Sequence, residues 1–161
     1  MNTPERIYFS VDPEVTGGES PENLKKVMEF LQSRGYTVYR APYVFADDRD
    51  EFLQRELGLD RPATLPQQRD LHMKWIDQTD ILLADISTSS EGRAMIIQRA
   101  LDKPTMGLPQ THIIFIKGKS FDRHIGKIVR GLIEGDEVVY FEYDRIEEVI
   151  ENWDTLVAKK K

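Results

Sequence analysis

Small polar side chains gather directly after one apolar segment of this 161-residue chain. The segment 80–86 reads Asp-Ile-Leu-Leu-Ala-Asp-Ile, and it is followed by Ser87, Thr88, Ser89, Ser90, Glu91, Gly92 and Arg93. In a parallel α/β sheet, a strand that delivers hydroxyls to the start of a helix forms a pocket, and the first helical N–H groups attract an anion. Gly92 would let a ligand approach the backbone, and Arg93 would add a charge-assisted bond to a phosphate. The stretch therefore predicts a site for a phosphate or a sugar, with ligand contacts from Ser87, Ser89, Ser90, Gly92 and Arg93.

Other interpretations compete for some of these side chains. Serine and threonine are preferred immediately before any helix, so one of the hydroxyls would serve only as a cap. Asp85 either binds a sugar hydroxyl or accepts N–H groups from a neighbouring loop. Asp80, at the other end of the same strand, is expected to be a turn residue. Tyr8, in the first apolar run, is expected to contact the ligand.

Three titratable residues are candidates for catalysis. Asp70 and His72 lie two positions apart on an expected helix, so they do not share a face and only one of them can point into the pocket. His72 would act as a neutral hydrogen-bond donor or as a general base, although a single helix histidine more often packs or faces solvent. Glu91 opens the helix after the central strand, where a negative charge also simply suits the helix dipole.

Several kinds of chemistry are not expected. The chain has no cysteine, which excludes disulfides, a thiol nucleophile and thiolate metal sites. His72, His112 and His124 lack the spacing of metal ligands, so no metal is expected. The segment 118–120, Gly-Lys-Ser, resembles the end of a phosphate-binding loop, but Ile113 stands where that pattern needs a glycine. No G-x-G-x-x-G motif is present.

The bulk composition narrows the partners. With 40% hydrophobic and 31% charged residues the chain is typical of soluble globular proteins, and no apolar run approaches the ~18 residues of a membrane span. A net charge of −6 argues against nucleic acid as a partner, and the one basic run, 159–161, fits a solvated chain end. The N-terminus reaches strand-like sequence without room for a signal peptide, so a cytoplasmic location is expected.

Hydrophobic periodicity predicts strands that alternate with helices, which indicates one parallel-sheet α/β domain over residues 1–161. Expected strands cover residues 6–11, 36–39, 81–86, 112–117 and 138–141. Expected helices cover residues 21–34, 47–57, 67–79, 91–101, 122–133 and 145–157. The less regular segment 41–66 is a candidate lid or substrate-contacting segment. Trp75 and Trp153 fit helical apolar patterns and are expected in the core.

Four groups of residues, in chain order, carry a family resemblance. They are Arg6-Ile-Tyr-Phe9, Gln68-Arg-Asp-Leu71, Asp80-Ile-Leu-Leu-Ala-Asp-Ile-Ser87, and Gly92 with Arg99-Ala100 and Lys103-Pro104. Together they resemble the nucleoside 2-deoxyribosyltransferase superfamily, which includes the 2′-deoxynucleoside 5′-phosphate N-hydrolases.

The resemblance implies a flavodoxin-like, doubly wound parallel sheet of five strands with helices on both faces, assembled as a homodimer or larger oligomer. It also implies cleavage or exchange of the N-glycosidic bond of a nucleoside or nucleotide. In that chemistry a carboxylate acts at the anomeric carbon and a second acid helps the base depart. No metal or organic cofactor is implied.

The reactive positions depart from the family pattern. With Arg99-Ala100 as anchor, the catalytic glutamate of the family falls on Ile96, which can neither attack nor take a proton. Counted back from Asp80 without a gap, the catalytic aspartate falls on His72, and Asp70 is two residues away.

Two further positions also differ. The first loop opens with Val11 and Asp12 instead of glycine and serine, and the aspartate would repel a phosphate unless it is paired. Before Ile128-Val-Arg-Gly131, Gly126 and Lys127 stand where the phosphate hydrolases have a serine that acts in the partner subunit.

The sequence therefore predicts a nucleoside- or nucleotide-binding domain of this type with lost or altered N-glycosidic chemistry. One alternative is an active transferase or hydrolase that uses Asp70 or His72 with Glu91 in rearranged roles. A second alternative is a protein-interaction domain with a vestigial pocket.

Overall fold

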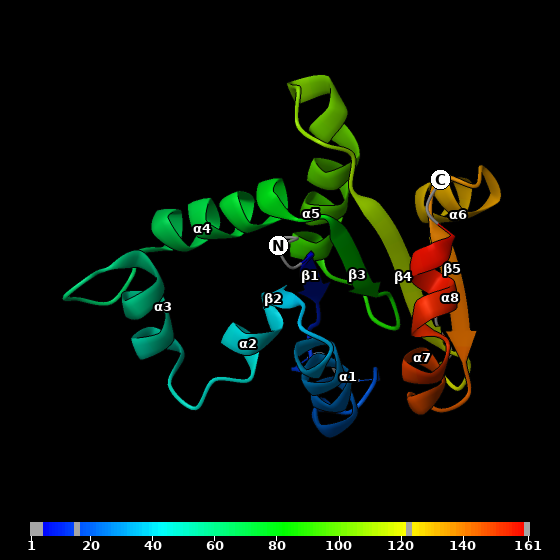
Figure 1. Cartoon of the computed structure of the whole chain (residues 1–161), viewed down its shortest axis with the longest axis horizontal. Helices are drawn as coiled ribbons and strands as arrows, with labels where there is room; N and C mark the ends of the chain where they lie inside the picture. Colours follow the sequence, from blue (N-terminus) through cyan, green and yellow to red (C-terminus); the bar gives the residue numbers. More distant parts are fainter. Residues whose placement is uncertain (1–4, 15–16, 122–123, 160–161) are drawn as a thin grey trace.

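Five strands form one parallel sheet in a computed structural model that describes residues 5–14, 17–121 and 124–159. The order across the sheet is β2-β1-β3-β4-β5 (Figure 1). The strands are β1 (Arg6–Ser10), β2 (Thr37–Tyr39), β3 (Ile81–Asp85), β4 (His112–Gly118) and β5 (Val139–Tyr143). This order, with helices on both faces, is that of the flavodoxin-like doubly wound sheet, and it confirms the predicted fold class.

The helices agree with most of the predicted ranges. They are α1 (Pro21–Ser33), α2 (Ala41–Val44), α3 (Arg49–Leu57), α4 (Leu65–Gln78), α5 (Glu91–Asp102), a 3-10 turn η1 (Lys103–Met106), α6 (Lys127–Glu134), α7 (Glu147–Glu151) and α8 (Trp153–Ala158). Ser20 caps α1 by accepting the N–H of Asn23, and Thr64 and Gln67 form a capping box at α4.

Two predicted helices were wrong in extent. The range 145–157 is not one helix, because it breaks at Asn152, whose side-chain amide donates to the Glu148 carbonyl at 2.8 Å. A side-chain amide that bonds the local backbone competes in this way with helix continuation. The helix expected from Asp122 begins at Lys127, after an extended Gly126. Asp122 itself lies outside the described residues, as do Lys160 and Lys161.

Alternation along the strands separates the core into two layers. Ile7 and Phe9 of β1 face the layer of α1, α2, α7 and α8, whereas Tyr8 faces the layer of α3, α4 and α5. Trp153 is buried in the first layer and Trp75 in the second, as predicted. Within the described ranges no helix is long and apolar enough to cross a membrane.

The chain leaves β1 and β3 toward opposite faces of the sheet. After β1 it continues into α1, and after β3 it continues into α5 (Figure 1). Where neighbouring strands diverge in this way, a crevice opens at their carboxyl ends. The two loops pack together through Gly18, because a Cβ there would collide with the methyl group of Thr88. Only glycine permits this approach, which holds the loop that follows β1 beside the start of α5.

Candidate functional site

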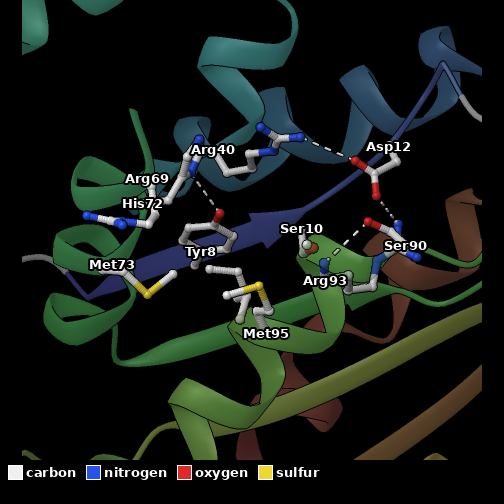
Figure 2. A pocket seen from close by; sticks show the side chains of 12 residues that line it. Tyr8, Ser10, Asp12, Arg40, Arg69, His72, Met73, Ser90, Arg93 and Met95 are labelled. Atoms are coloured by element: carbon white, nitrogen blue, oxygen red, sulfur yellow. Dashed lines mark hydrogen bonds and ion pairs between the residues drawn. The ribbon is translucent and has the colours of Figure 1, made fainter. Parts of the chain in front are cut away.

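A cavity of about 190 Å³ occupies this crevice on the side of α4 and α5. Its wall combines β1, the loop after it, the residue before α2, one face of α4 and the first two turns of α5 (Figure 2). Twelve described residues line it: Tyr8, Ser10, Asp12, Arg40, Arg69, His72, Met73, Ser90, Gly92, Arg93, Met95 and Ile96. Asp12, Arg40 and Arg93 gather at one end, whereas Met73, Met95 and Ile96 line the other end, where the exposed Arg69 also lies beside Met73 (Figure 2).

An ion-paired carboxylate dominates the charged end. Asp12 accepts Arg40 Nη2 on one oxygen at 3.2 Å and Arg93 Nη2 on the other at 3.0 Å (Figure 2). The Arg93 side chain is only 3% exposed and also donates to the Thr88 carbonyl, so its position is fixed. The charge on Asp12 that the sequence left in question is therefore paired twice. It no longer argues against an anion at this end.

Arg40 occupies an unusual backbone conformation. It follows β2 and precedes α2 with φ 69° and ψ −61°, which is close to a strained γ-turn that residues other than glycine rarely adopt. Its guanidinium lies 5.6 Å from the centre of the Tyr43 ring and reaches Asp12. Strain of this kind tends to occur at ligand sites, where the surroundings hold a side chain in place.

The N-terminus of α5 contributes backbone donors beside the same ion pairs. Ser90 caps the helix, with its hydroxyl accepting the N–H of Arg93 at 3.3 Å. The N–H groups of Glu91 and Gly92 belong to the first turn and so have no acceptor within the helix. A Cβ at Gly92 would meet only the Ser90 hydroxyl, at 3.8 Å, and Gly92 has no positive φ. Neither the backbone conformation nor the packing therefore requires glycine at this position. Close approach of a ligand to the helix backbone would explain it.

A neutral hydrogen-bonded pair lies between the two ends. The Tyr8 hydroxyl and His72 Nδ1 are 3.0 Å apart (Figure 2). Burial, helped by the charge of Arg40, lowers the pKa of His72 to about 4, and burial raises the pKa of Tyr8 well above its usual value. Both groups are neutral at pH 7. His72 can therefore donate or accept a hydrogen bond, but it lacks the imidazolium proton that a general acid would give to a leaving base.

The apolar end is built from α4 and α5. Met73 comes from α4, and Met95 and Ile96 come from α5. Ile96 is buried, whereas Met95 is 61% exposed at the rim. The position at which the resemblance places a catalytic glutamate thus faces the cavity, and its side chain there is alkyl.

The predicted site residues divide into two groups. Tyr8, His72, Ser90, Gly92 and Arg93 line the cavity together. The cavity does not include Asp70, Asp85, Ser87, Ser89 and Glu91.

Each residue of the second group has a different environment. Asp85 is buried and accepts the N–H of Ser87 at 3.0 Å, and burial raises its pKa. The Ser87 hydroxyl accepts the N–H of Gly118 at 3.2 Å, so both side chains hold the loop after β3. Asp70 is exposed and pairs with Arg69 at 2.6 Å, on a different helix face from His72. Ser89 and Glu91 are exposed as well.

Sequence reasoning missed Ser10, Arg40, Arg69, Met73 and Met95 as cavity residues. Two of these carried a usable signal. Ser10 stands two residues after Tyr8 on the same strand, so both must share a face. Arg40 directly follows β2, which runs parallel to β1. It must therefore lie at the edge of the sheet where both strands end, beside the cavity. The others depend on how α4 and α5 pack together, which periodicity does not specify.

The chemistry that this arrangement offers is limited. Of the described residues that line the cavity, Asp12 is the one with a carboxylate, and two guanidinium groups bind it. No cluster of three histidine, aspartate or glutamate side chains that could hold a metal ion occurs in the described part of the chain.

Comparisons with known proteins give the fold. No protein-family model matches the sequence, and no curated protein matches it. Among solved structures, the chain is similar to the CMP N-glycosidase BcmB of Clostridium botulinum, with a TM-score of 0.60 and 18% sequence identity. The similarity covers 94% of this chain and 98% of that one. At this identity it establishes a shared fold.

Proposed function

We propose that this chain binds a nucleoside 5′-monophosphate in the cavity, with its phosphate at the charged end and its base at the apolar end. We further propose that ordinary N-glycosidic chemistry is lost or altered. The observation that carries both parts is the lining of the cavity. Donors for an anion stand at one end, and Ile96 occupies the position where the resemblance places a reacting carboxylate.

The charge balance favours an anionic ligand. Arg40 and Arg93 together outweigh Asp12 by one positive charge, and both guanidinium groups are largely removed from solvent. Arg69 adds little, because it is exposed and already pairs with Asp70. The first N–H groups of α5 supply further donors, which is how helix N-termini hold phosphates.

The apolar end suits a flat ring. Methionine side chains are flexible and polarizable and make favourable contacts with aromatic rings, so Met73 and Met95 would enclose a base from two helices. The neutral pair of Tyr8 and His72 would then lie near the sugar and read a hydroxyl by a hydrogen bond.

The cavity lacks the parts of two-carboxylate chemistry. Such a reaction needs one carboxylate at the anomeric carbon and an acid that protonates the leaving group. Ile96 can do neither, and His72 is neutral above about pH 4. Asp12 is the carboxylate within reach, and two arginines bind it. These features support binding without ordinary catalysis.

An active N-glycosidase is the second candidate. It is favoured by the place of Asp12 in the cavity wall and by the activity named for the structural neighbour, a CMP N-glycosidase. In this version Asp12 would stabilise positive charge on the sugar. We also propose, from the resemblance alone, that the chain forms a homodimer or larger oligomer.

Calorimetry with CMP and with cytidine, together with chromatography for free cytosine, separates these functions. We expect CMP to bind at least tenfold more tightly than cytidine, since charge-assisted hydrogen bonds contribute about 1.5–3 kcal/mol each. We expect no cytosine. Cytosine release by the unaltered protein that disappears in an Asp12→Asn variant shown by circular dichroism to be folded would establish the second candidate instead. If neither CMP nor cytidine binds at millimolar concentration, the nucleotide site is refuted and an interaction domain is favoured.

A further inference from the structure

A second cavity adjoins the first. It encloses about 180 Å³ between the loop after β1 and the helices α2 and α3. Its charged and aromatic lining consists of Asp12, Glu14, Arg40, Tyr43 and Arg49. Asp12 and Arg40 line both cavities, so the ion pair between them is their common wall. A group bound at Arg40 in the first cavity therefore lies at the entrance of the second.

The second cavity holds a preorganised cation. Arg49 donates to the Val44 carbonyl from Nη2 at 3.0 Å and from Nε at 3.3 Å, and it lies 5.9 Å from the centre of the Tyr43 ring. Arg40 approaches the same ring to 5.6 Å. Both guanidinium groups therefore contact one ring, and all three side chains line the second cavity. Fixing donors before binding reduces the cost of ordering them around a ligand.

The present partner of Arg49 is easily exchanged. Arg49 Nη1 pairs with a carboxylate oxygen of Glu14 at 2.7 Å, but the Glu14 side chain is 73% exposed. Exposed pairs of this kind contribute little to stability, so a ligand anion can replace Glu14 at little cost. The strained backbone of Arg40 adds a second argument. The fold accepts an unfavourable φ at Arg40, which with Asp12 lines both cavities.

The part of the crevice on the other side of Arg93, away from Arg40, does not suit a charged group. Beyond Ser90 and Arg93 the crevice continues into a hollow of about 70 Å³ whose other lining is mainly aliphatic, including Ile86, Ala94 and Ile97. A second phosphate would lose its hydration there without gaining a cation other than Arg93, which already binds the first phosphate in this proposal.

We infer that the ligand carries a second phosphate, so that the site is built for a nucleoside 5′-diphosphate. This inference rests on the proposed nucleotide binding. The first phosphate would occupy the end formed by Arg40, Arg93 and the start of α5. The second would pass the Asp12–Arg40 wall and bind between Arg40 and Arg49, displacing Glu14.

Calorimetry with CMP and CDP on four proteins tests the inference. We expect CDP to bind the unaltered protein at least tenfold more tightly than CMP. Arg49→Gln should remove this advantage and leave the CMP affinity unchanged. Arg61→Gln, an exposed arginine outside both cavities, is the matched control and should keep it. Glu14→Gln should raise the affinity for CDP several-fold without changing the affinity for CMP. This variant still tests the inference if Arg49→Gln does not fold.

The outcomes distinguish this inference from the function on which it rests. Equal affinities for CMP and CDP, or equal weakening of both by Arg49→Gln, would overturn the diphosphate inference and leave nucleotide binding intact. Failure of both CMP and CDP to bind would overturn the two together.

Discussion

The two edges of the sheet carry similar charged groups and use them differently. At the amino edge, Asp80 accepts the backbone N–H of Arg6 at 2.8 Å and two of its guanidinium nitrogens at 3.2 Å. Nearby, Lys103 is 1% exposed and donates to the Thr79 carbonyl at 2.6 Å. At the carboxyl edge, Asp12 also binds arginine, but Arg40 and Arg93 reach it from different elements and surround a cavity.

The difference follows from how the chain crosses each edge. Asp80 and Arg6 stand at the starts of the adjacent strands β3 and β1, so the pair closes directly over the sheet and includes backbone. At the carboxyl ends of the same strands the chain diverges to opposite faces, and side chains must bridge the opening. An ion pair that includes the backbone is therefore structural, whereas one that spans a crevice is available to a ligand.

The largest effect should come from removing the carboxylate at the crevice. Asp12→Asn takes a carboxylate from Arg93, whose guanidinium is almost fully buried, and should lower the free energy of unfolding by about 3 kcal/mol. Asp80→Asn affects a more exposed pair and should cost about 1–2 kcal/mol. Urea denaturation of both variants measures the difference. Equal losses would mean that burial of Arg93 does not distinguish the edges.

The next largest effect is a loss of CMP affinity that we expect at the carboxyl edge of the sheet and not at the amino edge. Arg40→Gln should weaken CMP by about 30-fold, or about 2 kcal/mol, and leave cytidine unaffected, because the change removes a donor to phosphate only. Arg6→Gln is the matched substitution at the amino edge and should alter neither affinity. Calorimetry with both ligands measures the four values. If cytidine weakens as much as CMP, Arg40 does not bind the phosphate.

An effect of similar size, spread over a range of pH, should appear in the stability of the protein. The pKa of His72 is about 4 in the folded protein and near 6.5 when the chain is unfolded, so between these values the unfolded chain binds a proton that the folded protein does not. Acidification from pH 6.5 to pH 4 should therefore destabilise the protein, by at most about 1.4 kcal/mol per pH unit from this residue. The measurement is the stability of the unaltered protein minus that of His72→Gln across this range. A difference independent of pH would show that His72 titrates normally.

The smallest effect has opposite signs for stability and for binding. Gly92→Ala should raise the free energy of unfolding by about 0.5 kcal/mol, because alanine favours a helix and the added methyl has room. The same methyl should weaken CMP several-fold by narrowing the approach to the first turn of α5. Thermal unfolding with and without CMP measures both. Unchanged CMP affinity would place the ligand away from Gly92.

Local sequence patterns determined the fold to a large extent. Short continuous apolar runs located the five strands, and helical apolar spacing located most helices. The hydroxyls after β3 marked the start of α5 as one side of the crevice. The helix break at Asn152 was not predicted. It depends on one side-chain hydrogen bond to the Glu148 carbonyl that competes locally with helix formation.

The sequence by itself determined which residue types stand at the strand ends, including Ile96 where a carboxylate was expected. The tertiary structure decided which of those residues meet. Spacing along the chain cannot show that Asp12, Arg40 and Arg93, separated by 28 and 81 residues from Asp12, share one ion-pair bridge. It equally could not show that Asp85 and Ser87 use their polar atoms to hold a loop. The reason is that a pocket at a sheet edge is formed by loops that converge through packing, and packing is a property of the folded chain.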